Sequence, residues 1–468
     1  MVAELNLVLP GNPRTQPKEL KPIFGYDNLA LALVEVQIAN LHTLGDMEII
    51  PQDDIALLTP EVEARLYAIT TSAMDKLERE VTKHDIRALV RLMQDILPPT
   101  LRRWVHVPLT SYDVLDTARS LQFRRAHEDV IRPKLYEIIV LLCDLAMQYA
   151  SQVQIGRTHG QHALPITVGF WFPTIANRLL YNALKAEDAA GGLVGKISGA
   201  VGAYNAQHAL GFLDKSGKTY EERVLEKLGL KPSPTSTQIL PPEPLAYYLF
   251  ACFMCSATLA QFGRDSRHLM RTEIGELGEP FEVGQVGSST MAHKRNPMTF
   301  ENIEGTFQKN MGEFLKVMNN LVSEHQRDLV GSTIARDFPT ILVNLTEQMN
   351  RLLAPGGKDK KPFLARIAVD TEACSRNLRM QGDLILAEPI YLALQLEGYS
   401  GDAHELVNHK AVPLARAQGV SLYGAVELLC KENKELEDVW DAIPGEVHAL
   451  LRDPAGYTGL AKEKVWQV

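Results

Sequence analysis

Apolar residues recur at intervals of three and four positions over long stretches of this chain, a spacing typical of helices with one buried face. The longest stretch runs from Ser111 to about Ser151 and is broken only by Pro133. About forty helical residues would extend roughly 60 Å. Further long helices are predicted at about 166–190, 243–275 and 297–325, whereas the alternation typical of strands is nearly absent. The pattern predicts an all-α chain built on a long-helix bundle, which packing across subunits can help to cover.

Shorter helices are predicted from their capping residues. Asp27 to Leu44 has a helical pattern, and Gly45 is placed as its C-terminal stop. Thr59-Pro60 resembles an N-cap followed by a first-turn proline, which opens a helix running towards Glu80. His84-Asp85 begins the next element.

Breaks in the helical pattern divide the chain into three predicted domains. The length of 468 residues exceeds that of one typical domain. Prolines at 98, 99 and 108 interrupt the pattern first, and a Gly/Lys/Pro-rich run at 354–362 interrupts it again. We expect an N-terminal helical domain at 1–109, a central long-helix bundle at 110–353 and a C-terminal helical domain at 354–468.

The charge and cysteine content narrow the possible partners and compartment. A net charge of −9 argues against nucleic acid or an anionic membrane as the main partner. Five cysteines without a dense framework fit the reducing cytoplasm, and the N-terminus lacks the pattern of a signal peptide. The uncharged stretch from Pro244 to Gly263 is long enough to span a bilayer, but polar residues interrupt it and Arg264 and Asp265 follow at once. We interpret it as the core of the bundle.

Residues 284–305 gather the groups that an anionic substrate requires. Ser288 lies in a glycine-bearing loop, a cationic run with Lys294 follows, and Asn296-Pro297 is a candidate N-cap and first-turn proline of a helix that includes Glu301. Fixed positive charge beside the positive end of a helix dipole favours anion binding. An ordinary surface loop with a few basic residues explains the composition equally well.

Two other segments carry candidate chemistry. Thr110 and Ser111 stand at the head of the longest predicted helix, where their hydroxyls can cap the helix or bind a carboxylate. His159 follows Thr158 in a loop bounded by glycines and a proline, and an imidazole can act as acid or base. A loop histidine taken alone is more often a structural hydrogen-bonding residue.

These three segments together resemble the fumarase/aspartase superfamily. Residues 287–297, GSSTMAHKRNP, are similar to its signature GSSxMPxKxNP, except that Ala292 stands where the signature has the proline after methionine. With TSYDVLDT at 110–117 and GRTHGQHALP at 156–165, they resemble the adenylosuccinate lyase branch in particular. Further matching residues are His84, Asp85, the run 195–202, Thr237, Gln238, Gln326, Arg327, Asp328, Ser332 and Arg336. The resemblance is strong over roughly 80–340 and fades beyond.

The resemblance implies β-elimination that releases fumarate from a succinyl-purine nucleotide. It assigns Ser288 as the base and His159 as the acid, with Lys294 supplying positive charge and Glu301 orienting His159. Substrate binding would fall to His84, Asp85, Thr110, Ser111, Thr158, Gln238, Asn296, Arg327, Ser332 and Arg336; His106 is at best a further binding residue. Neither a metal nor a cofactor is expected, and the family implies a homotetramer whose sites are shared between subunits.

One departure leaves the substrate open. The family carries an Arg-Tyr pair near its N-terminus that holds the nucleotide phosphate, but Thr15 follows Arg14 here. Phosphate recognition would then depend more on Arg327, Ser332 and Arg336. Another succinyl substrate, such as argininosuccinate, remains an alternative, as does a catalytically silent structural relative. A silent relative need not keep Ser288, His159, Lys294, Asn296 and Glu301 together.

Overall fold

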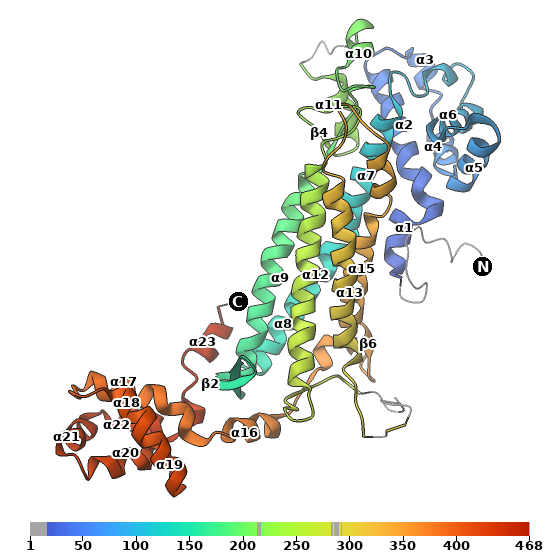
Figure 1. The fold of residues 1–468 in the computed structure, drawn as a ribbon. Helices are drawn as coiled ribbons and strands as arrows, with labels where there is room; N and C mark the ends of the chain where they lie inside the picture. Colours follow the sequence, from blue (N-terminus) through green and yellow to red (C-terminus); the bar gives the residue numbers. More distant parts are fainter. Residues whose placement is uncertain (1–15, 213–216, 282–283, 285–289, 292, 468) are drawn as a thin grey trace. The chain divides into compact units, whose positions relative to one another are not determined.

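The computed structural model describes residues 16–212, 217–281, 284, 290–291 and 293–467, which are predominantly helical (Figure 1). The described residues form two compact units. The first takes the chain up to Glu137, then Leu179–Ala260 and Asn302–Leu353; the second takes Ile138–Arg178, Gln261–Glu301 and the chain from Ala354 onward. The all-α prediction is confirmed, while the three-domain division stays a prediction.

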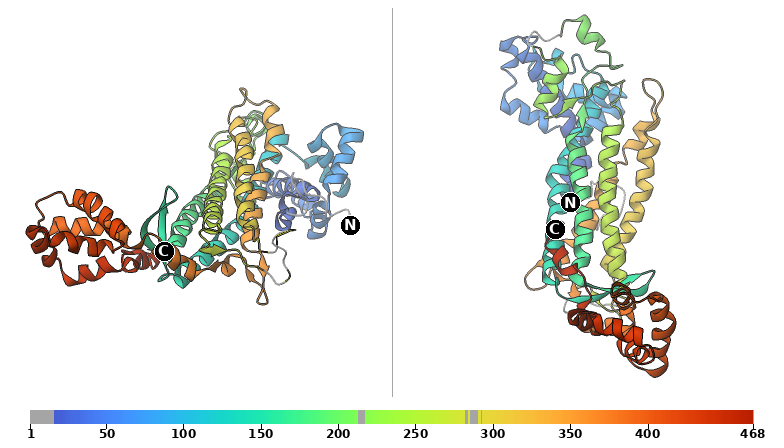
Figure 2. Two further views of the ribbon diagram at one scale, coloured as in Figure 1. Left: turned by 60° about the horizontal axis from the view of Figure 1, so that its bottom comes forward. Right: turned by 90° about the vertical axis from the view of Figure 1, so that its left-hand side faces the viewer.

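The elements can be followed along the chain in Figures 1 and 2. The helices of the first unit are α1 (Lys21–Phe24), α2 (Leu29–Asp46), α3 (Gln52–Ile55), α4 (Pro60–Tyr67), α5 (Thr71–Leu77), α6 (Asp85–Ile96), α7 (Ser111–Ala126), α10 (Asn205–Ala209), α11 (Tyr220–Lys227), α14 (Val330–Ala335) and α15 (Pro339–Leu352). Four long helices have residues in both units: α8 (Arg132–Gln148), α9 (Val168–Gly191), α12 (Glu243–Leu269) and α13 (Met298–Asn319). The helices of the second unit are α16 (Thr371–Arg379), α17 (Ala387–Leu396), α18 (Ala403–Leu406), α19 (Val412–Gln418), α20 (Leu422–Cys430), α21 (Lys434–Ala442), α22 (Gly445–Arg452) and α23 (Ala461–Val465).

Strands are short and occur in pairs. The largest pair is the antiparallel hairpin of β1 (Val153–Thr158) and β2 (Gln161–Thr167), whose register shifts between Ile155 and Arg157. Two-residue strands form the other pairs: β3 (Val194–Gly195) with β4 (Lys231–Pro232) in parallel, and β5 (Leu277–Gly278) with β8 (Ala368–Val369) and β6 (Pro355–Gly356) with β7 (Lys361–Pro362) in antiparallel orientation.

Two N-terminal helices, α2 and α4, end at other residues than the sequence predicts. Helix α2 continues through Gly45 to Asp46, so the predicted stop at Gly45 is wrong. Gly45 is needed for packing, because a Cβ added there would lie 2.6 Å from Cγ1 of Ile55. Thr59 caps α4 as predicted, but the helix ends at Tyr67 rather than running towards Glu80, since Thr70 accepts from Ala73 N and starts a second helix, α5.

The long helices agree with the apolar spacing, and α12 and α13 end earlier than predicted. The stretch from Ser111 is interrupted before Pro133, by a π-helical segment at His127–Ile131 that separates α7 from α8. A π-bulge has no composition signal of its own. Helix α6 begins at Asp85, where the sequence predicts the start of the next element, and His84 is its N-cap residue.

Buried polar side chains join α9, α12, α13 and α15, which run side by side in Figure 1. Asn182 donates to Thr258 at 3.0 Å, and Ser256 donates to Gln348 at 2.6 Å. Asn310 of α13 donates to Ser256 at 3.2 Å. These contacts satisfy Ser256 and Thr258, two of the polar residues that interrupt the uncharged sequence of α12. Although α12 is long and apolar enough to cross a membrane, 56% of its apolar window is buried, and it is a core helix of the bundle.

One buried histidine in the first unit has no hydrogen-bond partner among the described residues. His127 is 2% exposed, and neither ring nitrogen has a hydrogen-bond partner in the described part of the chain. Its ring packs edge-on against Tyr248, with the ring centres 5.6 Å apart. Burial lowers the pKa of His127 from 6.5 to about 4.

Acidification is therefore expected to destabilise the fold through His127. Between pH 6.5 and about 4 the unfolded chain binds a proton at this histidine and the folded chain does not. The free energy of unfolding then falls as the pH falls, by up to about 3 kcal/mol from this group. Denaturant unfolding at neutral and acid pH should show a weaker pH dependence in His127→Phe than in the wild type. His208→Phe, at an exposed position of α10, is the control. If the free energy of unfolding depended on pH as strongly in His127→Phe as in the wild type, His127 would not be the destabilising group.

Candidate active site

Four polar side chains from distant parts of the first unit meet beside the head of α7. Arg327 donates to Gln238 Oε1 at 3.0 Å and to Tyr112 Oη at 2.8 Å. Tyr112 Oη and Ser332 Oγ lie 2.6 Å apart, and the Arg327 guanidinium stacks over the Tyr112 ring at 3.7 Å. The structure thus brings together Gln238, Arg327 and Ser332, and adds Tyr112, which the sequence reasoning missed. Its place directly after Ser111 was the available signal.

The head of α7 is fixed from within by a buried ion pair. Thr110 is the N-cap, and its backbone N–H donates to Asp113 Oδ2 at 2.9 Å. Asp113 pairs with Lys196, and both side chains are fully buried. The N–H groups of Ser198 and Gly199 also donate to Asp113, each at 3.2 Å. Because the carboxylate is held on several sides, the half-buried Thr110 and Ser111 are presented on a rigid helix end.

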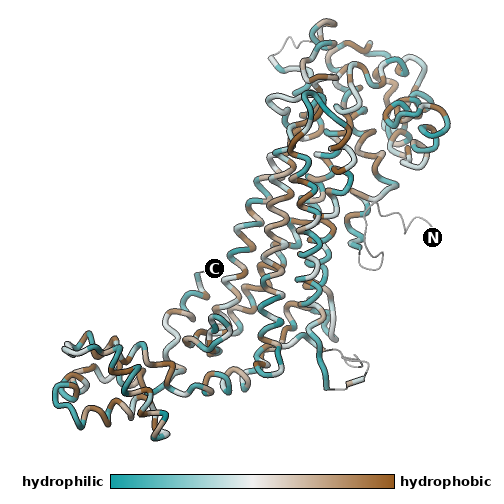
Figure 3. Tube along the Cα trace, in the orientation of Figure 1, coloured by the Kyte–Doolittle hydropathy of each residue, from teal (hydrophilic) through white to brown (hydrophobic). Residues whose placement is uncertain are grey.

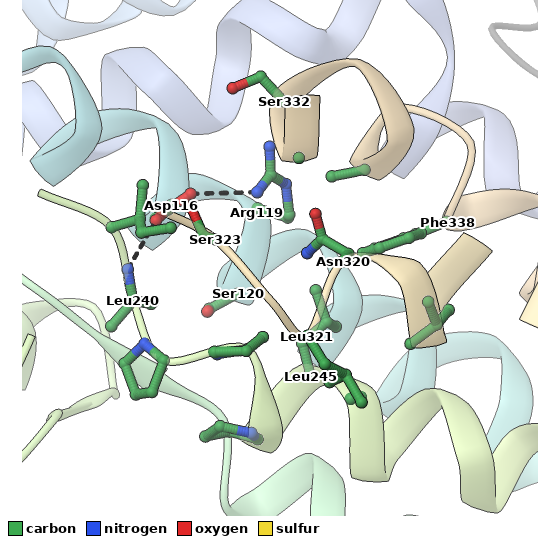
Figure 4. Close-up of a pocket in the computed structure, with 18 of the residues that line it drawn as sticks. Asp116, Arg119, Ser120, Leu240, Leu245, Asn320, Leu321, Ser323, Ser332 and Phe338 are labelled. Atoms are coloured by element: carbon green, nitrogen blue, oxygen red, sulfur yellow. Dashed lines mark hydrogen bonds and ion pairs between the residues drawn. The ribbon is translucent and has the colours of Figure 1, made fainter. Parts of the chain in front are cut away.

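Asp116 fixes the segment that carries Gln238. Its carboxylate accepts from Leu240 N at 2.9 Å and from Arg119 at 3.1 Å (Figure 4). Burial raises the pKa of the Asp116 carboxyl, and the neighbouring Arg119 opposes this shift. Asp116, Arg119 and Ser332 also line the pocket of Figure 4, together with Asn320, Leu321 and Phe338.

His159 lies at the turn between β1 and β2. It adopts a left-handed backbone conformation with φ of 55°, and Gly160 follows with φ of 75°. Thr158 pairs with Gln161 across the turn, and the residues from Thr158 to Gln161 are all exposed. The predicted constrained loop is therefore the tip of a hairpin. The imidazole stands at the end of a projecting element, which suits a group that must reach a ligand.

The signature segment is only partly described. Ser288 and Ala292 lie outside the described residues, as do Arg14 and Thr15. Lys294 is exposed and Asn296 is half-buried before α13, with Met298 N donating to Asn296 O at 2.9 Å. Helix α13 begins at Met298, two residues after the predicted N-cap.

The N-terminus of α13 already binds a carboxylate of its own chain. Glu279 Oε1 accepts from Thr299 N at 2.8 Å and from Phe300 N at 2.9 Å. Burial raises the pKa of Glu279, and these two backbone N–H groups oppose the shift. The sequence predicts that the N-terminus of α13 binds the substrate, but two of its backbone N–H groups donate to Glu279. Glu301 is exposed in the first turn of the same helix.

The remaining candidates lie in the first unit. His84 Nδ1 is 3.0 Å from Asp85 Oδ1 at the start of α6, and both side chains are accessible. Gln37 Nε2 donates to His106 Nδ1 at 2.8 Å, and burial lowers the pKa of His106 to about 4. His106 is therefore a neutral hydrogen-bonding group near neutral pH. Arg336 is exposed at the C-terminal end of α14, one turn after Ser332.

The candidate residues thus belong to two groups. Thr110, Ser111, Gln238, Arg327, Ser332, Arg336, His84 and Asp85 lie in the first unit; Thr158, His159, Lys294, Asn296 and Glu301 lie in the second. Among the described residues, no three His, Cys, Asp or Glu side chains gather as metal ligands.

Comparison with known proteins places the chain in a family. Residues 52–312 match a family model described as lyase. The chain is 32% identical over 464 residues to adenylosuccinate lyase of Archaeoglobus fulgidus, which covers 99% of this chain and 98% of the relative. The chain belongs to the adenylosuccinate lyase family. The family member of Bacillus subtilis is 30% identical over 397 residues, covering 84% of this chain and 86% of the relative.

Solved structures agree on the fold of this adenylosuccinate lyase family member. A fumarate lyase from Mesorhizobium aligns with a TM-score of 0.80 at 21% identity, covering 98% of this chain and 99% of the other. A 3-carboxy-cis,cis-muconate lactonizing enzyme from Pseudomonas putida aligns with a TM-score of 0.78 at 23% identity, covering 97% of this chain and 96% of the other. At these identities the structures show the fold alone, so the substrate has to be argued from the site.

Proposed function

We propose that this family member is a cytoplasmic carbon–nitrogen lyase of purine biosynthesis. It eliminates fumarate from adenylosuccinate, leaving AMP, and from the related succinyl-carboxamide nucleotide. The observation that carries the proposal is the family relationship over 99% of the chain. Ser288, His159, Lys294, Asn296 and Glu301 are all present, so the groups that the reaction needs are kept.

The elimination requires a base to remove a proton, a cation to stabilise negative charge and an acid to protonate the leaving nitrogen. Ser288 removes a proton from the carbon beside a carboxylate, and the electron pair spreads onto that carboxylate as a dianion. Lys294 and Asn296 stabilise the added charge, which is costly without positive groups nearby. The C–N bond then breaks as the double bond of fumarate forms, and His159 protonates the leaving nitrogen. Lys294 also stabilises the Ser288 alkoxide, since a neutral hydroxyl is a weak base.

The first-unit cluster is the proposed nucleotide site. Arg327 carries a positive charge, is braced by Gln238 and Tyr112, and lies within 3.3 Å of the Ser332 hydroxyl. Arg336 adds an exposed guanidinium one turn along α14. A guanidinium and a hydroxyl at this spacing suit a phosphate, with Thr110 and Ser111 available for a carboxylate.

Arg336→Ala is expected to weaken AMP binding by about 2 kcal/mol, as expected for a charge-assisted contact. Isothermal titration of AMP measures the change. Arg65→Ala, which removes an exposed guanidinium of α4, should leave the affinity as it is. An unchanged affinity in Arg336→Ala would show that the substrate carries its phosphate elsewhere, or carries none.

The proposed assembly is a homotetramer with sites shared between subunits. Large apolar side chains stand exposed along α9, α12 and α13, among them Tyr181 (65%), Tyr247 (68%) and Leu315 (64%). Figure 3 shows hydrophobic residues along these helices. A second copy of the chain would cover them, as long bundle helices require. His159 of one subunit would then meet Ser288 and Glu301 of another.

Product analysis tests the function. Incubation with adenylosuccinate should yield AMP and fumarate in equal amounts without an added metal or cofactor. Because Thr15 stands where the family has tyrosine, argininosuccinate stays the second candidate substrate. Fumarate release from argininosuccinate with none from adenylosuccinate would replace the proposal by that alternative.

A further inference from the structure

A buried carboxylate in the second unit gathers donors from two distant elements. Glu276 is 1% exposed, immediately before β5. Arg157 of β1 donates to both of its oxygens, at 2.7 and 2.8 Å, as a bidentate pair. Gln154 of β1 donates to Oε2 and Asn377 of α16 donates to Oε1, each at 2.7 Å. Within the described chain, each carboxylate oxygen therefore accepts two hydrogen bonds.

The backbone of Glu276 is held as firmly as its side chain. Its N–H donates to Leu269 O at the end of α12 at 3.0 Å, and its carbonyl accepts from Asp370 N at 3.1 Å. Asp370 is the N-cap of α16, where its side chain accepts from Ala373 N at 2.9 Å. Glu276 thus ties β1 to the end of α12 and the start of α16, and cannot shift alone.

The contacts of Glu276 end where the exposed hairpin tip begins. Gln154 is 4% exposed, and the Arg157 side chain is 14% exposed. Thr158, His159 and Gly160 beyond it are exposed. Arg157 is therefore the last residue of β1 that a buried contact fixes before His159. The direction in which the tip projects depends on that anchor.

We infer that Glu276 is a positioning residue for His159, acting through Arg157 and completed by Asn377 from the C-terminal part of the chain. The inference rests on the proposed function, in which His159 is the acid. Proton transfer is sensitive to small displacements of the donor, because the reacting atoms have to be held within hydrogen-bonding reach. The nucleotide cluster of the first unit makes none of these contacts, so substrate binding should be affected much less than turnover.

Glu276→Gln is expected to lower kcat at least about tenfold while KM changes less than about twofold. The amide keeps the size of the side chain but leaves the Arg157 charge without its partner. Arg157→Lys keeps the positive charge but loses the bidentate guanidinium contact, so its kcat should lie between those of Glu276→Gln and the wild type. Asn377→Asp, which sets a second carboxylate beside Glu276, should also lower kcat. Arg376→Ala is the control on α16, since the exposed Arg376 donates to Ile274 O, a carbonyl that Asn377 also contacts, and not to the Glu276 carboxylate.

Hydrogen exchange separates positioning from a general loss of stability. Amides of residues 153–167 should exchange faster in Glu276→Gln, with the α20 and α21 amides unchanged. This readout does not depend on the reaction. If the wild type failed to convert adenylosuccinate, the proposed function would fail while the hairpin anchoring could still be measured. An unchanged kcat in both Glu276→Gln and Asn377→Asp would overturn the inference.

Mixed assemblies show which catalytic segment Glu276 supports. If Glu276 acts through the His159 hairpin, Glu276→Gln and Ser288→Ala subunits can complement each other in a mixed assembly. After random exchange, about one quarter of all sites should then have wild-type residues at both positions. Exchange with His159→Gln subunits should restore none. The reverse outcome, recovery with His159→Gln only, would place the effect of Glu276 on the signature segment and overturn the proposal.

Discussion

Ser288→Ala is expected to lower turnover at least about a thousandfold while leaving substrate affinity nearly unchanged. Removal of a positioned base abolishes the step that takes the proton from carbon, whereas the phosphate and carboxylate contacts remain. Steady-state turnover and equilibrium binding of adenylosuccinate to the variant measure the two effects separately.

The neighbouring hydroxyl supplies a matched control for that variant. Ser289→Ala removes the same atoms one residue later, and it should retain far more activity than Ser288→Ala. Near-wild-type turnover in Ser288→Ala would contradict the assignment. A large loss in Ser289→Ala alone would move the base to Ser289.

Mixtures of inactive His159→Gln and Ser288→Ala subunits are expected to regain activity. If each site takes His159 from one subunit and Ser288 from another, random exchange gives each position even odds of an intact residue. About one quarter of the sites should then carry both, in a closed symmetric assembly. The prediction follows from the proposed tetramer, in which α9, α12 and α13 cover one another across subunits.

The parent variants define the baseline for this experiment. Each alone should remain inactive after the same mild denaturation and reassembly, and mass measurement should confirm that subunits have exchanged. Activity at the parental background despite confirmed exchange would mean that His159 and Ser288 act within one chain, and the shared-site assembly would be wrong.

Elements governed by local spacing could be predicted from the sequence. Apolar periodicity predicts helices α9, α12 and α13. The position of Thr59 before Pro60 predicts that it is an N-cap. Around His159 the sequence predicts a loop where the structure has a hairpin, because glycines and a proline punctuate the segment and the strand register shifts beside Arg157. Strand pairing of this kind depends on contacts that periodicity does not reveal.

The supporting residues of the candidate site were harder to find. Lys196 and Asp113 are 83 residues apart in sequence, and Arg157 and Glu276 are 119 residues apart. Glu279 caps α13 from 20 residues upstream. Each charged residue resembles an ordinary surface residue in the sequence, since only the folded chain brings its distant partners to it. The motif resemblance names candidate reacting residues and assigns no role to these anchors.

The proposed substrate is a succinyl-purine nucleotide. Absorbance assays with adenylosuccinate and argininosuccinate, run side by side on the wild type and on His159→Gln, test this proposal. The proposed function predicts rapid cleavage of adenylosuccinate by the wild type, little or no cleavage of argininosuccinate, and loss of activity in the variant. Cleavage of argininosuccinate alone, or of neither substrate, would contradict it.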